Sequence, residues 1–347
     1  MAGETPYAAQ PPRAFWKTAV AARHPSEISD LWWPKWATEP ETRYATAGSC
    51  FAQHLGAALC ARGLAWVDAE PAPARMPQDL RTRFSYGQFS CRTGNIYTAR
   101  QFRQWLEWSL TGASPPDEAW RRDDRWIDPF RPRIEPEGFG SEAELQEARK
   151  ATLAALRTAA RDADVFIFTR GQTEGWRDLT TGVEYPICPG VAGGEYNPQR
   201  HVLKNATTSE VRADVLACLR LLRRARGDIR MLLTVSPVPM TATANDEHVL
   251  VASTHTKSVL RAVAGELARE EPAIDYFPSY EIITAPPFRA SHFQPNMREV
   301  APAGVEFVMS RFLGEAVQPP PPGADGATDA DAEPDCDDRL LDRYAEA

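Results

Sequence analysis

The segment Tyr44-Ala-Thr-Ala-Gly-Ser-Cys-Phe-Ala52 brings a hydroxyl and a thiol to the point where an apolar strand is expected to turn into a helix. Gly48 can take a sharp turn that other residues resist, and Ser49 can cap the first turn of the helix. Cys50 would then lie at the positive end of that helix, where a thiolate is favoured. The pattern predicts a reactive thiol or hydroxyl; the alternative is an ordinary strand-to-helix turn with a buried cysteine.

Polar residues also follow two later apolar runs, and the carboxyl ends of parallel strands are where chemistry collects in an open sheet. The run from Phe166 leads into Gly171, Thr173 and Glu174, and a third run ends at Ser236 between prolines. A Gly94-Asn95 turn lies between the apolar run that starts at Tyr44 and the one that starts at Phe166. It leads into an expected helix, 100–110. Glu174 could orient a base or hold a substrate hydroxyl, or it could be a carboxylate that favours a helix N-terminus.

A general base for the thiol is best sought first at His54, which is four residues after Cys50 and would lie on the same helical face. The alternative is that His54 packs or faces solvent. His255 and His292 could also converge on the site, although a surface role is the alternative for each. The remaining histidines (His24, His201 and His248) lie in polar contexts that favour exposure.

The elements that must position these residues alternate along the chain. Strands are predicted at Tyr44–Ala47, Leu64–Val67, Asp164–Thr169, Met231–Val235 and Ile274–Tyr276. Helices are predicted at Phe51–Ala61, Glu142–Ala163, Ser209–Arg226, Val249–Arg269 and Val305–Leu313. Alternating strands and helices imply an α/β fold, a three-layer α/β/α sandwich around a parallel sheet. The tryptophans Trp105, Trp108, Trp120 and Trp126 could stack on a sugar ring, but the helical spacing of the first two favours core packing.

Composition narrows the possible functions. The 347 residues carry a net charge of −8, of which −7 belongs to residues 318–347, so residues 1–317 carry only −1 and offer no basic excess for a nucleic acid. Six scattered cysteines form no CxxC pair, and neither a GxGxxG nor a GxxxxGK[ST] motif occurs, so we expect no disulfide framework, metal or other cofactor. No segment is apolar enough to span a membrane, and the start lacks the features of a secretory signal, so we expect a cytoplasmic protein.

Three regions are predicted. Residues 1–40 form an extension that packs on the core, residues 41–317 form the α/β domain, and residues 318–347 form a Pro-rich acidic tail. The tail composition predicts disorder, apart from a short helix at Arg339 to Tyr344. The tail is either a docking segment or a solubilising extension.

Gly48-Ser49-Cys50-Phe51-Ala52 resembles the motif that names the GSCFA family. Five further segments fit the same resemblance in the same order, over roughly residues 40–315: Gly94–Tyr97, Thr169–Trp176, Ser236–Val238, Thr256–Ser258 and Tyr276–Glu281. That family is similar to the SGNH or GDSL hydrolases, a flavodoxin-like α/β fold whose members cleave or transfer acyl esters. The resemblance implies Cys50 at the nucleophile position, Ser49 beside it, and Gly94 with Asn95 and the Gly171–Glu174 segment, including Thr173, around the oxyanion.

The last block departs from the hydrolase pattern. Those enzymes carry Asp-x-x-His before a Gly and a final helix, and the same frame here reads Asn296-Met-Arg-Glu299. A neutral amide and a carboxylate cannot reproduce an Asp-oriented imidazole, although Glu299 could accept a proton if burial raised its pKa.

The leading prediction is acyl-ester chemistry, as a hydrolase or an acyltransferase, with Cys50 or Ser49 as nucleophile and, by resemblance, acylated carbohydrates or other small esters as substrates. A second class stays open, a catalytically impaired relative that keeps the pocket as a carbohydrate-binding or scaffold module. Cysteine-dependent transfer from a thioester donor is a third possibility.

Overall fold

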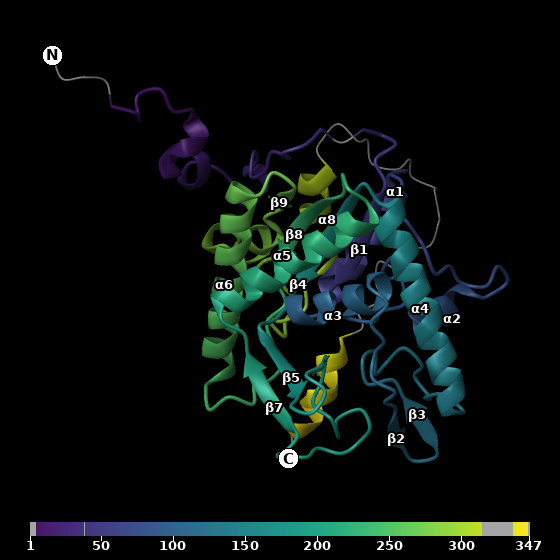
Figure 1. Ribbon diagram of the computed structural model, residues 1–347. Helices are drawn as coiled ribbons and strands as arrows, with labels where there is room; N and C mark the ends of the chain where they lie inside the picture. Colours follow the sequence, from purple (N-terminus) through teal and green to yellow (C-terminus); the bar gives the residue numbers. More distant parts are fainter. Residues whose placement is uncertain (1–4, 38, 314–335, 346–347) are drawn as a thin grey trace.

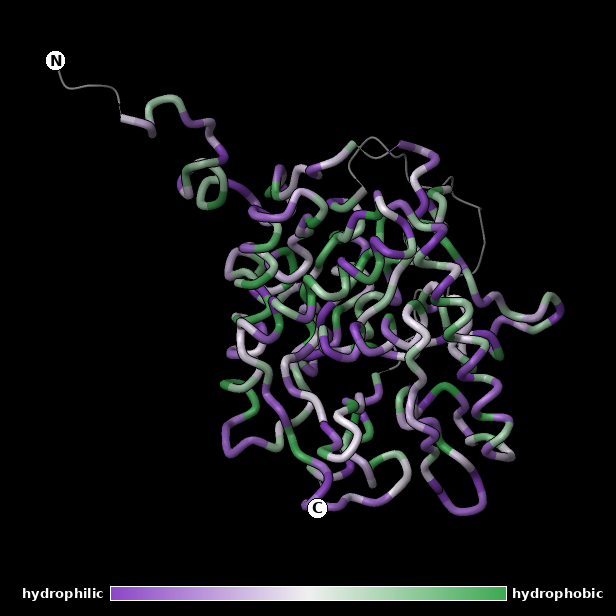
Figure 2. Tube along the Cα trace, in the orientation of Figure 1, coloured by the Kyte–Doolittle hydropathy of each residue, from purple (hydrophilic) through white to green (hydrophobic). Residues whose placement is uncertain are grey.

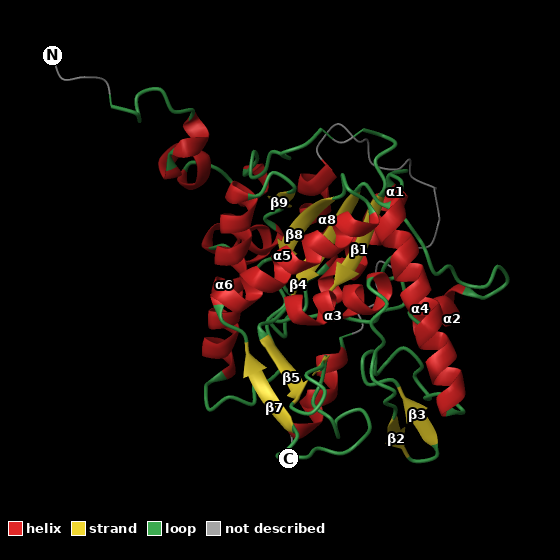
Figure 3. Cartoon of the chain, in the orientation of Figure 1, coloured by secondary structure: helices red, strands yellow, loops and turns green. Residues whose placement is uncertain are grey.

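The computed structural model describes residues 5–37, 39–313 and 336–345. Its centre is a parallel sheet in the order β1-β4-β8-β9, formed by Tyr44–Gly48, Val165–Arg170, Arg230–Val235 and Ile274–Tyr276. Figure 3 shows this sheet with helices in front of it and behind it. Two small antiparallel sheets accompany it: β2 (Trp120–Arg122) with β3 (Arg125–Ile127), and β5 (Glu174–Asp178) between β6 (Glu184–Tyr185) and β7 (His201–Asn205). The predicted α/β architecture with a parallel sheet is confirmed.

Strand alternation decides which helices cover which face. Phe166 and Phe168 of β4 belong to one hydrophobic cluster and Val165 and Ile167 to the other. The first cluster is completed by α3 (Ala99–Leu110), α4 (Glu142–Asp162), α5 (Thr208–Ala225) and α6 (Val249–Glu270). The second is completed by α1 (Gln53–Ala61), α7 (Ser279–Thr284) and α8 (Pro302–Leu313). Figure 2 shows the hydrophobic residues concentrated between these layers.

The predicted strand at 64–67 does not form a full strand. It makes a single parallel bridge, between Tyr44 and Trp66, with hydrogen bonds from Tyr44 N to Ala65 O and from Val67 N to Tyr44 O. Beyond that point the edge of β1 is occupied by Ser90, whose Oγ accepts from the Thr46 N–H and whose own N–H donates to the Thr46 carbonyl. The competing partner therefore ends the pairing after one residue. A short helix, α2 (Gln78–Arg83), lies between the two segments.

The sheet register aligns three strand ends. Gly48 pairs with Thr169, and Thr169 pairs with Thr234, so the residues that follow β1, β4 and β8 emerge at one edge. The Ser236 N–H then donates to the Arg170 carbonyl. The predicted convergence of these three strand ends is therefore present.

Only part of the N-terminal region packs on the domain. Trp32 packs against Phe277 and Phe312, with ring centroids 5.2 and 5.7 Å apart, whereas the segment with the short helices η1 (Pro12–Ala14) and η2 (Lys17–Ala21) projects from the body in Figure 1. Two further short helical turns are η3 (Pro25–Glu27) and η5 (Pro286–Phe288).

Most of the predicted disordered tail lies outside the described residues, but its end does not. Cys336–Asp338 are buried, and a 3-10 helix, η6, runs over Asp337–Tyr344. Cys336–Asp338 therefore pack on the domain, whereas the composition of the tail favours disorder. Figure 1 shows this yellow helix beneath the lower ends of the strands, near β5. Within the described ranges no helix is both long and apolar enough to cross a membrane.

Candidate active site

The turn after β1 depends on Gly48. Its φ is +142°, a region that other residues rarely adopt, and a Cβ there would lie 2.2 Å from the Thr169 carbonyl oxygen. The Ser49 N–H donates to that same carbonyl at 2.9 Å, which fixes the start of the next turn, η4 (Cys50–Ala52), directly before α1. Sequence and structure agree that only glycine allows the close approach that presents Ser49 and Cys50 at the sheet edge.

Ser49 does not cap the helix, so that expectation is wrong. No hydrogen bond from its side chain caps η4, and its Oγ has no hydrogen-bond partner among the described residues, although the residue is only 2% exposed. A Cβ placed on Gly171 would lie 2.9 Å from the Ser49 Cβ, so the hydroxyl lies close to the end of β4. A buried hydroxyl without a partner costs about 1–3 kcal/mol. The Ser49 proton is therefore uncommitted at a strand end.

Cys50 is 3% exposed and lies at the N-terminus of the helical segment. Cys336 is its neighbour, since the two thiols interact and both cysteines belong to the same hydrophobic cluster. Two cations, Lys257 and Arg298, interact electrostatically with Cys50. Cys50 is therefore held between positive charges and a second thiol, which is more than an ordinary buried cysteine requires.

Lys257 is the residue at this site that the sequence reasoning did not assign. It lies on α6, is 4% exposed, and donates from Nζ to the Gly171 carbonyl at 2.7 Å. Burial lowers its pKa from 10.5 to about 7, although the charge of Cys50 acts in the opposite direction. The signal was present in the sequence, because Lys257 occupies the same helical stripe as the buried Leu260 and Ala264.

His54 is half-buried in the first turn of α1, after the η4 turn that contains Cys50. Burial lowers its pKa from 6.5 to about 4, its Nε2 has no partner in the described part of the chain, and its ring packs edge-on to Phe51 at 5.8 Å. A base works best when its pKa lies near the operating pH. At neutral pH, Lys257 is therefore matched better to proton abstraction than His54.

The Gly94-Asn95 turn reaches the same edge. The Ile96 N–H donates to the Gly48 carbonyl at 2.8 Å, and Gly94 has a φ of +64°. Gln53 Nε2 donates to Asn95 Oδ1 at 3.3 Å, which joins this turn to α1. The Gly171 N–H donates to the Tyr97 carbonyl at 2.9 Å, so that amide is already occupied. Gly171 therefore lies against Ser49, and Asn95 contacts the start of α1.

Comparison with known families matches residues 43–312 to the GSCFA family, which is more than half of the chain. The chain belongs to the GSCFA family. No curated protein matches this sequence. The GSCFA match includes the turn at Ser49 and Cys50, the Gly94-Asn95 turn and Lys257, whereas Cys336 and η6 lie outside it.

Within this GSCFA domain, Thr173 and Glu174 are committed to other partners. The Thr173 hydroxyl donates to Asn205 Oδ1 at 2.7 Å and shares a hydrogen bond with Thr256 at 2.8 Å. Glu174 accepts from Asn245 Nδ2 at 2.6 Å and from Thr243, and burial raises its pKa. In this arrangement Thr173 has no proton left for an oxyanion, and Glu174 holds the loop after β8.

Asn296 and Glu299, which take the places of Asp and His in the hydrolase block, have different partners. Asn296 is exposed, and its Oδ1 accepts from the N–H groups of Arg298 and Glu299, both at 3.0 Å. Glu299 forms an ion pair with Arg339 of the C-terminal helix. Asn296 thus shapes the turn, and the side chains that follow it, Arg298 and Glu299, contact the C-terminal segment.

The other histidines do not converge on Cys50. His292 Nδ1 contacts the Ile282 carbonyl at 3.1 Å and its ring packs on Phe288 and Phe307, while His255 is exposed. His201 is buried, contrary to its polar context. Trp105, Trp108 and Trp120 are core residues, so the core-packing interpretation is confirmed for them.

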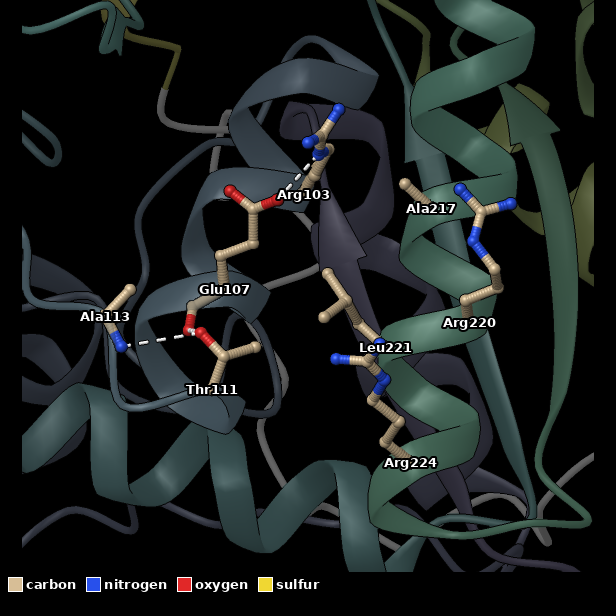
Figure 4. Close-up of a pocket in the computed structure, with 8 residues that line it drawn as sticks. All are labelled: Arg103, Glu107, Thr111, Ala113, Ala217, Arg220, Leu221 and Arg224. Atoms are coloured by element: carbon tan, nitrogen blue, oxygen red, sulfur yellow. Dashed lines mark hydrogen bonds and ion pairs between the residues drawn. The ribbon is translucent and has the colours of Figure 1, made fainter.

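Three surface pockets lie elsewhere on the molecule, with volumes of about 320, 510 and 460 Å³, and neither Ser49 nor Cys50 lines any of them. Figure 4 shows the first, between α3 and α5, where Arg103 and Glu107 form an ion pair on one side and Arg220 and Arg224 lie on the other. Among residues 5–37, 39–313 and 336–345, no group of three or more His, Cys, Asp or Glu side chains is placed to hold a metal ion.

Proposed function

We propose that this GSCFA protein hydrolyses or transfers acyl groups through a covalent acyl-enzyme on Cys50, with Lys257 as the general base. The observation that carries the proposal is the buried Lys257 amine, whose pKa is lowered to about 7 beside Cys50. A lysine in water is protonated at neutral pH and cannot accept a proton. At pKa 7 about half of the Lys257 amine is neutral, and it can do so.

The steps follow from the residues at the turn. The Lys257 amine takes the Cys50 proton, the thiolate attacks the acyl carbonyl, and the ester oxygen leaves after protonation by the Lys257 ammonium. Water or an acceptor hydroxyl, deprotonated by Lys257 in turn, then releases the acyl group. The resemblance to SGNH hydrolases favours small acyl esters, including acylated carbohydrates, as substrates.

The oxyanion formed during each step needs donors near Cys50. The N–H groups of Cys50 and Phe51 open a helical segment, where amide groups lack intrahelical acceptors and the helix dipole is positive. The Ser49 hydroxyl, whose proton has no acceptor among the described residues, adds a third candidate donor. Such donors contribute about 3–4 kcal/mol each to transition-state stabilisation in acyl transfer.

The test is to trap the acyl-enzyme. Reduced protein is incubated with p-nitrophenyl acetate and digested, and the acetylated residue is identified by mass spectrometry. We expect acetyl on Cys50, loss of that label in Cys50→Ala, and about 100-fold slower labelling in Lys257→Met. Labelling of Ser49 instead would move the nucleophile by one residue. Labelling that is unchanged in both Cys50→Ala and Ser49→Ala would refute the proposal.

One observation favours a second candidate function, a binding module. Asn296 and Glu299 replace the hydrolase Asp and His, and Ser49 Oγ has no imidazole partner in the described residues. In that case the site beside Ser49 and Cys50 binds a ligand without turning it over. An acylated sugar that protects Cys50 from alkylation, in a protein that never becomes acylated, would support binding over catalysis.

A further inference from the structure

The C-terminal helix η6 lies outside the region shared with the GSCFA family, yet it begins at the candidate active site. Cys336, Asp337 and Asp338 are buried, while residues 342–345 are exposed. An acidic segment that merely keeps a protein in solution has no reason to bury its charges. The burial of two neighbouring carboxylates therefore indicates a built contact.

Asp337 is held by residues of the predicted oxyanion region. Its Oδ2 accepts from Asn95 Nδ2 at 3.1 Å and from the Tyr97 hydroxyl at 3.3 Å, and its backbone N–H donates to the Tyr97 oxygen at 2.9 Å. Burial and the charge of Asp337 raise the Tyr97 pKa well above its ordinary value, so the phenol keeps its proton and remains a donor. The carboxylate thus occupies groups that would otherwise face a ligand.

The neighbouring residues anchor the segment on both sides. Arg133 Nη1 donates to the Cys336 carbonyl at 3.0 Å, Arg298 pairs with Asp338 at 2.8 Å, and Arg339 pairs with Glu299. Arg298 and Glu299 belong to the turn that replaces the hydrolase Asp-x-x-His block. The segment Cys336–Tyr344, here called the C-terminal latch, therefore covers the nucleophile, the Asn95 turn and the last block together.

The latch places a thiol on the candidate nucleophile. The Cys336 thiol interacts with Cys50 within one hydrophobic cluster, and both are free cysteines. A disulfide needs sulfur atoms that can approach to about 2.05 Å from backbones about 4.4–6.8 Å apart at Cα. Cys50 and Cys336 are interacting neighbours in one buried cluster, which is the proximity that a disulfide requires.

We propose that Cys50 and Cys336 form a reversible disulfide that locks the C-terminal latch over the candidate site. The oxidant is a small disulfide such as oxidised glutathione. The Cys50 thiolate attacks one glutathione sulfur and releases the first reduced glutathione, and the Cys336 thiolate then attacks the Cys50 sulfur and releases the second. The two cysteines lose two protons and two electrons, and one oxidised glutathione becomes two reduced molecules.

The consequence for function rests on the proposed acyl transfer at Cys50. In the reduced protein the latch is held by non-covalent hydrogen bonds and ion pairs, so it can open for a ligand. In the oxidised protein the nucleophilic sulfur is consumed and the cover is covalent. Acyl transfer would therefore be switched off by oxidation and restored by dithiothreitol.

The experiment measures the disulfide without relying on acyl transfer. Full-length protein is treated with oxidised glutathione, blocked with N-ethylmaleimide and mapped by mass spectrometry. We expect a Cys50–Cys336 cross-linked peptide that dithiothreitol removes. Cys336→Ser, the matched variant, should instead accumulate glutathione on Cys50. The exposed Cys60 serves as an internal control, since it should form only mixed disulfides. A wild-type map in which Cys50 carries glutathione and no cross-link would overturn the proposal.

A second measurement keeps the test independent of folding defects. In reduced protein, N-ethylmaleimide should label Cys50 much more slowly than Cys60, and Asp337→Asn should speed Cys50 labelling by about tenfold or more, because it weakens two hydrogen bonds to a charged acceptor. Equal labelling rates for Cys50 and Cys60 in the wild type would contradict the latch. Acyl labelling that fails even in reduced protein, beside a normal cross-link, would refute the proposed function and leave the disulfide standing.

Discussion

Replacing Lys257 with methionine tests the buried amine, because methionine fills a similar volume and carries no charge. Lys257 is 4% exposed, and its pKa falls from 10.5 to about 7 on folding. Between these two values the unfolded chain binds more protons than the folded one, so stability must rise with pH in that window. Methionine removes this proton-linked term and leaves the remaining groups in place.

The size of the effect follows from the two pKa values. Each pKa unit is worth about 1.36 kcal/mol, so the buried ammonium disfavours folding by about 5 kcal/mol below pH 7, and this penalty shrinks as pH rises toward 10.5. Between pH 6 and pH 9 the free energy of unfolding of the wild type should therefore increase by roughly 2–3 kcal/mol relative to Lys257→Met.

Urea unfolding of both proteins at pH 6, 7, 8 and 9, in reducing buffer, gives the two stability curves. Lys150→Met is the matched control, because Lys150 is exposed and pairs with Glu147 on the surface; its curve should run parallel to that of the wild type. Parallel curves for the wild type and Lys257→Met would refute the reasoning, since they would mean that Lys257 titrates alike in the folded and unfolded chains.

Three further substitutions test the framework of the site. Gly48→Ala should cost more than about 3 kcal/mol, because the new Cβ would meet the Thr169 carbonyl at 2.2 Å; Gly63→Ala, at a φ of +69° in open space, should cost only about 1 kcal/mol, and equal losses in urea unfolding would argue against the close approach. Asp128→Asn should cost about 3–5 kcal/mol, because the fully buried carboxylate pairs with Arg131 at 2.7 Å and Arg149 at 2.9 Å; a calorimetric midpoint close to that of the wild type would contradict this. Thr207→Ala should cost about 1 kcal/mol by removing the capping box of α5, whereas Thr158→Ala on the surface of α4 should stay within about 0.5 kcal/mol.

The sheet and its helices were predictable because their signals are local. The apolar runs that became β4, β8 and β9 are short and bounded by turns, and the helical stripes of α4, α5 and α6 are long. The single bridge formed by the edge segment at 64–67 was not predictable from the sequence. Its pairing with β1 is limited by Ser90, a competing partner that no local pattern reveals.

The site was predictable only in part, because some of its contacts join residues that are distant in the sequence. The sequence Gly48-Ser49-Cys50 predicts a strand-to-helix turn. Because the strands are parallel, β4 and β8 end at the same edge of the sheet as β1. Lys257 is distant in sequence and is one of several polar residues along α6. Its role depends on the depth at which α6 packs, which composition does not fix.

The C-terminal latch was the feature least predictable from the sequence. Its composition predicts disorder, and that inference considers each residue only with its neighbours in sequence. Asp337 and Asp338 are ordered by Asn95, Tyr97 and Arg298, which lie far away along the chain. Partners of this kind can be found only once the fold has brought them together.

The central claim, that the turn after β1 carries the nucleophile, is tested most directly by the pre-steady-state release of p-nitrophenolate from p-nitrophenyl acetate in reduced protein. We predict a burst approaching one p-nitrophenolate per protein molecule, followed by slower turnover, with the burst lost in Cys50→Ala and retained in Cys60→Ala. A burst of the same size in a variant that carries both Cys50→Ala and Ser49→Ala would contradict it.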